Sequence, residues 1–193
     1  MSDSGPNQAE SGRQIEALLA AYAAGTLSEP FAVLVASHLQ MKADHHPGAA
    51  DQQSPRPPIS ALEQMHALMP LALRHYVGRH LGGALAWRTI LPGLKQCRIA
   101  RDARADASFL RCRPGKAIPA HTHDGLEAVL VLQGGFHDAD GHYARGDIAV
   151  ADYTIEHRPV ADRSVECIIF LVLGAPVKLT GPFGRFIQRI FGT

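Results

Sequence analysis

The chain has 193 residues, of which 46% are hydrophobic and 19% are charged, and its formal net charge is +1. This balance is typical of a globular protein with one domain or two small ones, and it excludes a disordered tail or a coiled coil. A net charge so close to zero gives no electrostatic reason to expect direct binding of nucleic acid.

Two amphipathic helices are predicted in residues 1–42. Ser11 and Gln14 form a capping box for the first helix, which ends at Gly25. Ser28 can cap the second helix. The stripe of this second helix consists of Phe31, Leu34, Val35 and His38. Because two short helices cannot bury a core by themselves, we expect this unit to pack on another part of the chain or on a partner.

A proline-rich linker is predicted in residues 43–58, which contain no aromatic or branched aliphatic side chain. Residues 59–85 are expected to form two connecting helices. Ser60 and Glu63 make a capping box for the first of them, Pro70 ends it, and a pair of glycines closes the second.

From residue 86 onward the pattern changes from helical to β, with short strands at a spacing typical of a barrel. The expected strands are residues 87–90, 94–100, 107–113, 126–133, 136–143, 147–151 and 165–173. Asp140 and Gly141 are candidates for a hairpin turn, and the apolar run 167–173 predicts a strand buried on both faces. Apolar residues at helical spacing in 183–191 predict a terminal helix on the barrel, so this domain spans residues 86–193.

Four residues in this β-rich part have the chemistry and the spacing of a metal site. His121 and His123 are two residues apart and therefore point to the same face of a strand. Glu127 follows after Gly125, where the chain can bend, and His157 arrives from a later strand. Three imidazoles and one carboxylate suit a divalent transition metal, namely Zn, Mn, Fe(II) or Ni.

The same residues carry a resemblance to the cupin superfamily, whose members are small double-stranded β-barrels that often hold a metal in their mouth. The first cupin motif is matched at Gly115, His121, His123, Glu127 and Gly134. The second motif keeps Gly146 and His157. It departs from the family pattern at Asp152, Thr154 and Ala161, where the family prefers Pro, Gly and Asn. The ligand positions are all retained, so the resemblance implies a metal-binding cupin barrel.

The chain as a whole resembles the ChrR-type zinc anti-sigma factors, bacterial regulators with a helical anti-sigma domain followed by a cupin-like domain. The resemblance is carried by residues 18–31, 36–39, 76–79, 87–89, 132–134, 146–148, 151–152, 156–157 and 159–161, besides the cupin motif. It implies a mixed α and β protein, with a small N-terminal helical anti-sigma-like unit followed by a cupin double-stranded β-barrel.

In that family the helical domain sequesters an extracytoplasmic-function sigma factor, and an oxidative signal sensed through the cupin domain releases it. The resemblance therefore implies a transcriptional regulator that responds to oxidative stress or a ligand and has a sigma factor as its partner. It also implies a sigma-binding helix face made of Phe31, Leu34 and Val35. Zinc is favoured in the barrel by the resemblance alone, and a homodimer through the cupin domain is kept as a hypothesis.

The N-terminal zinc site of that family is not retained. The family's ligands are a histidine before the first helix and a His-x3-Cys-x2-Cys pattern at the end of the second. His38 stands at the family's second histidine, whereas Arg13, Lys42 and His45 occupy the other positions. These residues cannot complete a closed four-ligand site. We expect no zinc there, and His38 and His45 are either residual ligands or core histidines.

Two further functions stay open. The first is a metal-dependent cupin enzyme, an oxygenase or isomerase whose helices serve dimerisation, because four protein ligands leave coordination positions open for a substrate. The sequence shows no clear second set of acid and base groups, since His137 and His142 flank the hairpin as exposed residues. The second is a cupin that only stores or binds metal. We expect the regulator and not an enzyme.

The cysteines and the hydropathy indicate the compartment. Cys97, Cys112 and Cys167 are odd in number and unclustered, which is not a disulfide framework and favours a reducing compartment. Residues 1–13 lack an apolar segment, and no later stretch has the length of a membrane span. We expect a soluble, cytoplasmic protein that does not associate with a membrane.

Overall fold

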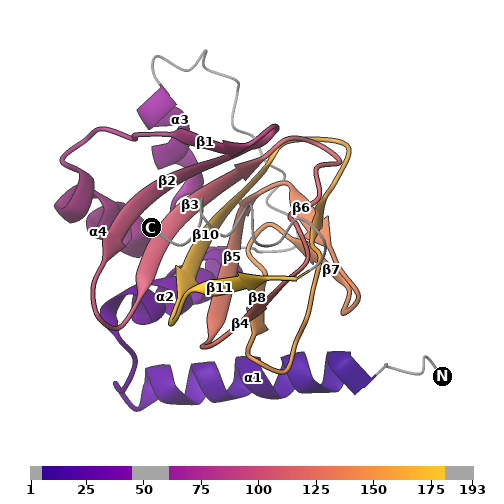
Figure 1. Ribbon diagram of the computed structural model, residues 1–193. Helices are drawn as coiled ribbons and strands as arrows, with labels where there is room; N and C mark the ends of the chain where they lie inside the picture. The colour runs from indigo at the N-terminus through magenta and orange to yellow at the C-terminus, as the bar shows by residue number, and fades with distance from the viewer. Residues whose placement is uncertain (1–5, 45–60, 181–193) are drawn as a thin grey trace.

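Helices precede strands in the computed structural model, which describes residues 6–44 and 61–180 (Figure 1). The helices are α1 (Pro6–Ala23), α2 (Glu29–Asp44), α3 (Ala61–Leu68) and α4 (Leu71–Leu81). Helix α4 ends at Gly82, whose φ of 54° is the left-handed conformation that glycine adopts easily, as the sequence predicts.

The start of α1 differs from the prediction. The helix begins at Pro6, not at the capping box of Ser11 and Gln14, because proline at a first helical position has no N–H to leave unsatisfied. Ser11 lies inside the helix, and its hydroxyl donates to Oδ2 of Asp140 at 3.0 Å. This serine therefore joins α1 to the β-rich part instead of capping the helix.

The strands form three antiparallel sheets. They are β1 (Arg88–Leu91), β2 (Leu94–Arg101), β3 (Asp106–Cys112), β4 (His121–His123), β5 (Glu127–Gln133), β6 (Gly135–His137), β7 (His142–Ala144), β8 (Ile148–Ala151), β9 (Val160–Ala161), β10 (Cys167–Leu173) and β11 (Val177–Leu179). The orders are β1-β2-β3-β10-β5-β8, β11-β4 and β7-β6-β9. The two small sheets lie across the open side of the large one, which gives a β-barrel (Figure 1).

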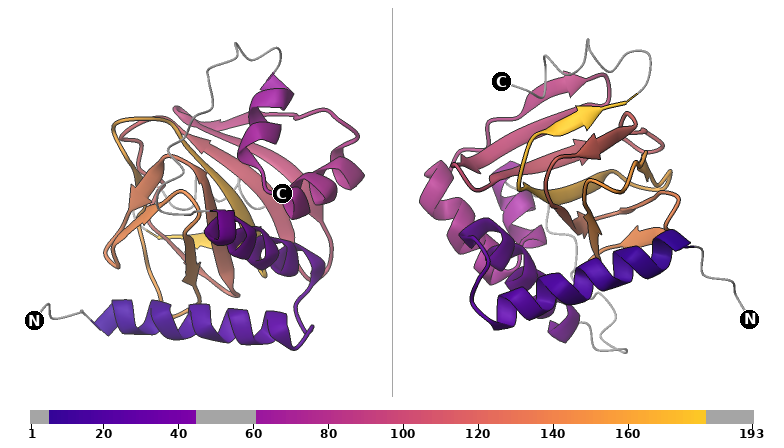
Figure 2. Two further views of the ribbon diagram at one scale, coloured as in Figure 1. Left: turned by 180° about the vertical axis from the view of Figure 1, so that it is seen from behind. Right: turned by 60° about the horizontal axis from the view of Figure 1, so that its bottom comes forward.

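The large sheet separates two apolar cores. In β10, the residues on the helix side are Ile168, Phe170 and Val172, and those on the barrel side are Cys167, Ile169 and Leu171. Successive side chains of a strand point to opposite faces, so both faces are apolar only where both are covered. Figure 2 shows the cover, with α2 and α4 on the outer face of the sheet. This explains the unbroken apolar run and confirms its predicted burial.

Helix α2 contributes its apolar stripe to the core on the helix side. Phe31, Leu34 and Val35 are 7%, 0% and 0% exposed, and α2 packs against β5 and β10. The residues predicted as the sigma-binding face are therefore not a surface in this structure. Helix α4 and the barrel sheet together cover them, because a short amphipathic helix needs partners for its apolar face.

Several expectations fall outside the described residues. These are most of the linker, His45, and the terminal helix predicted in residues 183–191. Within residues 6–44 and 61–180, no helix is long and apolar enough to span a membrane.

Candidate metal centre

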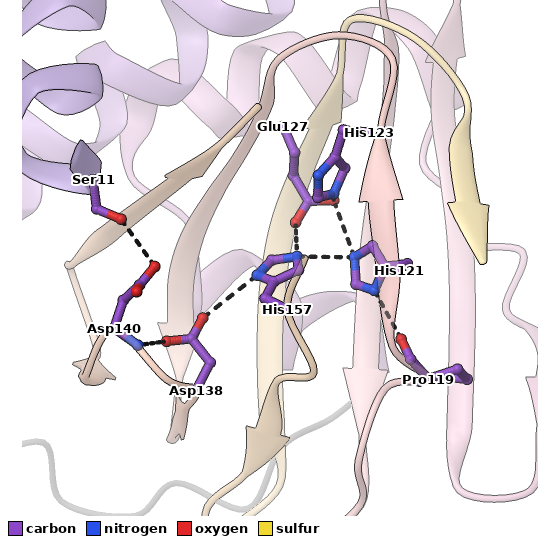
Figure 3. Close-up of polar contacts among 8 residues, drawn as sticks. All are labelled: Ser11, Pro119, His121, His123, Glu127, Asp138, Asp140 and His157. Carbon is purple, nitrogen blue, oxygen red and sulfur yellow. Dashed lines mark hydrogen bonds and ion pairs between the residues drawn. The ribbon is translucent and has the colours of Figure 1, made fainter. Parts of the chain in front are cut away.

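The four predicted ligands converge inside the barrel (Figure 3). His121 and His123 lie on β4 and Glu127 begins β5, whereas His157 lies in the segment before β9. Two backbone hydrogen bonds hold His157 beside β4, from His121 N to His157 O at 3.1 Å and from His157 N to His121 O at 3.2 Å. Both histidines of β4 are buried and face the same side, as their separation by two residues predicts.

The distances between ligand atoms fit a cation. Nε2 of His121 lies 3.0 Å from Nε2 of His157, and Nε2 of His123 lies 3.0 Å from Oε2 of Glu127. The other contacts of Glu127 are 3.4 Å to His157 and 3.7 Å to His121. Ligands bound at about 2.1 Å are separated by about 3.0 Å in an octahedral and about 3.4 Å in a tetrahedral arrangement. The four residues therefore fit a divalent transition metal.

Contacts outside the site orient two of the three imidazoles, whereas Nδ1 of His123 is buried without a hydrogen-bond partner among the described residues. Nδ1 of His121 donates to the carbonyl oxygen of Pro119 at 2.8 Å, so the lone pair of Nε2 points into the site. Nδ1 of His157 lies 3.4 Å from Oδ2 of Asp138. A partner behind a ligating histidine fixes its tautomer and ring orientation.

The electrostatics of the site favour positive charge. Burial alone would raise the pKa of Glu127, but its contacts with the imidazoles of His121, His123 and His157 outweigh it and hold this pKa well below its usual range. Burial likewise opposes the charged form of His157, yet Asp138 and Glu127 raise its pKa to about 9. In the metal-free protein, the proton on His157 therefore supplies the positive charge beside Glu127 and Asp138. A bound cation would supply that charge instead.

The metal site borders a cavity in the barrel. The cavity has a volume of about 260 Å³, and its wall includes His121, Glu127 and His157. Most of its remaining wall is apolar, with Val129, Phe136, Ile169 and Leu171 among the residues that line it. A small molecule with an apolar body and one polar group could lie there beside the metal site.

Two glycines near the site, Gly134 of the cupin motif and Gly125 before Glu127, are required for different structural reasons. Gly134 has a φ of +66°, and a Cβ atom there would lie 2.8 Å from the carbonyl oxygen of Glu166. Gly125 was expected to permit a bend, and the chain does bend there, but its φ is not positive. A Cβ at Gly125 would instead approach the backbone nitrogen of Ala175 to 3.0 Å. Close packing therefore selects glycine at this position.

The N-terminal histidine has a different role from the two that the sequence suggested. His38 is half-buried, and its Nδ1 donates to the carbonyl oxygen of Gly146 at 2.7 Å. One turn later, Nζ of Lys42 lies 2.6 Å from Oδ1 of Asp147. These residues bind α2 to the turn before β8. In the part of the chain that the structure describes, His121, His123, Glu127 and His157 are the single group of three or more residues that could hold a metal ion.

Sequence reasoning missed Asp138. Its side chain is only 4% exposed and lies behind His157, but the local sequence Asp-Ala-Asp-Gly reads simply as a hairpin turn. Its pairing with a histidine nineteen residues later depends on how the sheets meet. The exposed positions of His137 and His142 are as expected, with side chains 56% and 55% exposed.

Comparison with known proteins places the chain in a family. It is 34% identical over 206 aligned residues to the anti-sigma-E factor ChrR of Cereibacter sphaeroides, an alignment that covers 91% of this chain and 95% of that protein. The chain belongs to the ChrR family. Residues 82–177 match the ChrR cupin-like domain in particular.

A solved structure shares the ChrR fold. The crystal structure of Rhodobacter sphaeroides SigE in complex with the anti-sigma ChrR matches with a TM-score of 0.63 and 38% identity. The match covers 81% of this chain and 95% of the chain in that structure. The order of helices and then a cupin barrel is thus that of a ChrR protein.

Proposed function

We propose that this protein is an anti-sigma factor that binds an extracytoplasmic-function sigma factor and keeps it from RNA polymerase. The observation that carries the proposal is the likeness to ChrR over 91% of the chain, which includes the helices as well as the barrel. Because sigma factors act on RNA polymerase, we place the protein in the cytoplasm. Direct contact with nucleic acid is not part of the proposal.

The barrel would sense the signal with a divalent metal. The proposed ligands are His121, His123, Glu127 and His157, and zinc is the proposed ion because the donor set is nitrogen-rich and the family is a zinc one. When bound, the ion would polarise the oxygen of an oxidant or ligand in the adjacent cavity. The residues of this chain would exclude bulk water and hold the ligands in place, since all four side chains are at most 8% exposed.

The location of the apolar stripe restricts how a sigma factor could bind. Phe31, Leu34 and Val35 are buried in one core with α4 and the barrel sheet, so they can contact a sigma factor only if α2 leaves these neighbours. We keep these residues as the proposed contact face of that released state. Docking of α2 on the barrel and binding of a sigma factor to this face of α2 then exclude one another.

A co-purification experiment tests the proposal. The tagged chain is co-expressed with each extracytoplasmic-function sigma factor of the same genome, and a stoichiometric complex with one of them is expected. A His123→Ala variant, which loses a barrel ligand, should retain at least as much of that sigma factor after washing, because its α2 leaves the barrel more easily. If no sigma factor is retained by a folded, metal-loaded chain, the proposal fails.

The cavity beside the metal site favours a second candidate, a cupin enzyme that acts on a small oxygenated substrate. Its volume of about 260 Å³ is enough for such a molecule. The proposed regulator would bind a ligand without turnover. Oxygen consumption by the zinc- and iron-loaded protein with small diketones and carboxylates distinguishes the two, and a metal-dependent rate would favour the enzyme.

A further inference from the structure

Residues 138–147 lie between the metal centre and both N-terminal helices. This segment contains the β6–β7 turn, strand β7 and the turn into β8. One part of it faces the metal ligand His157, and other parts contact α1 and α2. Figure 3 shows the first half of this arrangement, from His157 through Asp138 and Asp140 to Ser11.

The carboxylate of Asp138 is held in place at both ends. Oδ2 lies 3.4 Å from Nδ1 of His157, and Oδ1 accepts a hydrogen bond from the backbone N–H of Asp140 at 2.9 Å. The backbone N–H of Asp138 also donates to the carbonyl oxygen of Gly141 at 3.0 Å. Turning the carboxylate of Asp138 away from His157 would therefore break its hydrogen bond with the N–H of Asp140 in the hairpin turn.

The same segment makes polar contacts with the helices. Asp140 Oδ2 accepts the hydroxyl of Ser11 on α1 at 3.0 Å. The carbonyl oxygen of Gly146 accepts Nδ1–H of His38 at 2.7 Å, and Oδ1 of Asp147 pairs with Lys42 at 2.6 Å. The other oxygen of Asp147 accepts a backbone N–H within the segment at 2.9 Å, which fixes that carboxylate.

We propose that Asp138 positions His157 for the metal, and that residues 138–147 couple the metal centre to the docking of α1 and α2 on the barrel. The inference rests on the metal site proposed above and adds a route by which its state reaches the helices. If one segment links metal binding to helix docking, each equilibrium changes the equilibrium constant of the other by the same factor. A bound metal thus strengthens helix docking, and docked helices strengthen metal binding.

Zinc affinity tests the role of Asp138. Competition with a chromogenic chelator is measured for the full-length wild type and for Asp138→Asn. A roughly 10- to 100-fold weaker affinity is expected, which is the usual effect of removing a carboxylate behind a ligating histidine. Asp44→Asn, which removes a carboxylate from the exposed end of α2, is the control and should bind zinc as the wild type does.

The coupling is tested from the helix side. The double variant Ser11→Ala/Lys42→Ala removes two contacts far from the ligands and should weaken zinc binding by about two- to tenfold. Hydrogen exchange gives the reciprocal measurement, in which zinc should slow exchange in α1 and α2 of the wild type. The slowing should be smaller in Asp138→Asn.

The failures of the two proposals are distinguishable. If the wild type binds no zinc, the metal centre and the coupling both fall. If zinc binds with wild-type affinity to a folded Asp138→Asn, or if zinc does not alter exchange in the helices, the coupling is overturned and the metal centre stands. Should Asp138→Asn not fold, wild-type zinc affinity in the double variant overturns the coupling.

Discussion

Glu127 supplies negative charge to a site otherwise made of imidazoles. Its contacts with the imidazoles of His121, His123 and His157 keep it ionised despite burial. We therefore expect Glu127→Gln, which preserves size and removes charge, to reduce zinc from stoichiometric to a small fraction, as measured by elemental analysis after dialysis. His142→Ala removes an exposed histidine of the nearby hairpin and should keep its zinc. Full zinc occupancy in Glu127→Gln would exclude the carboxylate as a ligand.

His157 makes the metal-free protein sensitive to pH. Asp138 and Glu127 overcome the effect of burial and raise its pKa to about 9 in the folded state, against about 6.5 in an unfolded chain. A group whose pKa is raised by folding stabilises the protein below the unfolded pKa, and this contribution is lost as the pH rises through the folded pKa.

Between pH 6.5 and 8.5, chelator-treated protein should therefore lose on the order of 2 kcal/mol of unfolding free energy. Urea unfolding at several pH values measures how the unfolding free energy changes with pH. The loss should be absent in His157→Ala. Above pH 8.5 a second group adds to the pH dependence of stability. Burial raises the pKa of Cys112 to about 12 in the folded protein, so this thiol ionises only in the unfolded chain. A stability that is flat or rises with pH from 6.5 to 8.5 would contradict this account of His157.

At the scale of elements, α2 and the large sheet share one core. Leu34 is 0% exposed within it, so Leu34→Ala should cost about 2–5 kcal/mol of unfolding free energy. Because helix and sheet bury the same residues, unfolding should remain a single transition. Leu39→Ala on the same helix is the control, since this leucine is 45% exposed and its loss should change stability by less than about 0.5 kcal/mol. Separate transitions for helices and barrel would show that the shared core is not cooperative.

The sequence predicted the larger elements well, and local patterns explain why. The apolar run of β10 and the helix ends at Pro70 and Gly82 follow from signals within a few residues. Strands β9 and β11 have only two or three residues, too few for β propensity to indicate a strand. The predicted role of Ser11 was wrong because its partner, Asp140, is 129 residues away. The stripe of α2 was recognised, but a stripe does not say which surface will cover it.

The candidate site was likewise predictable only where its residues follow a local pattern. The spacing of His121, His123, Glu127 and His157 was sufficient because strand periodicity and the cupin pattern both apply to it. The contributions of Asp138 and Lys42 were not predictable, because each depends on a contact between distant segments. Lys42 could be recognised only as a departure from the family's ligand pattern, not as a residue that holds α2 on the barrel.

At the scale of the whole molecule, docking of α2 and binding of a sigma factor through its apolar stripe should compete. A short bis-maleimide that joins Lys42→Cys to Asp147→Cys would lock α2 on the barrel, since these side chains are in contact in the docked state. Sigma affinity should then fall by at least about tenfold relative to the same variant treated with a mono-maleimide. Unchanged affinity of the locked protein would mean that the sigma factor binds an exposed surface and not this stripe.

The central claim is that the chain withholds a sigma factor from RNA polymerase. The most direct measurement is transcription in vitro from a promoter that depends on the co-purifying sigma factor, with increasing amounts of the zinc-loaded chain. We expect transcription to fall to background when the chain reaches stoichiometry with the sigma factor, and to be unaffected at a promoter served by the housekeeping sigma factor. Undiminished transcription at a large excess of folded, zinc-loaded chain would contradict the assignment as an anti-sigma factor.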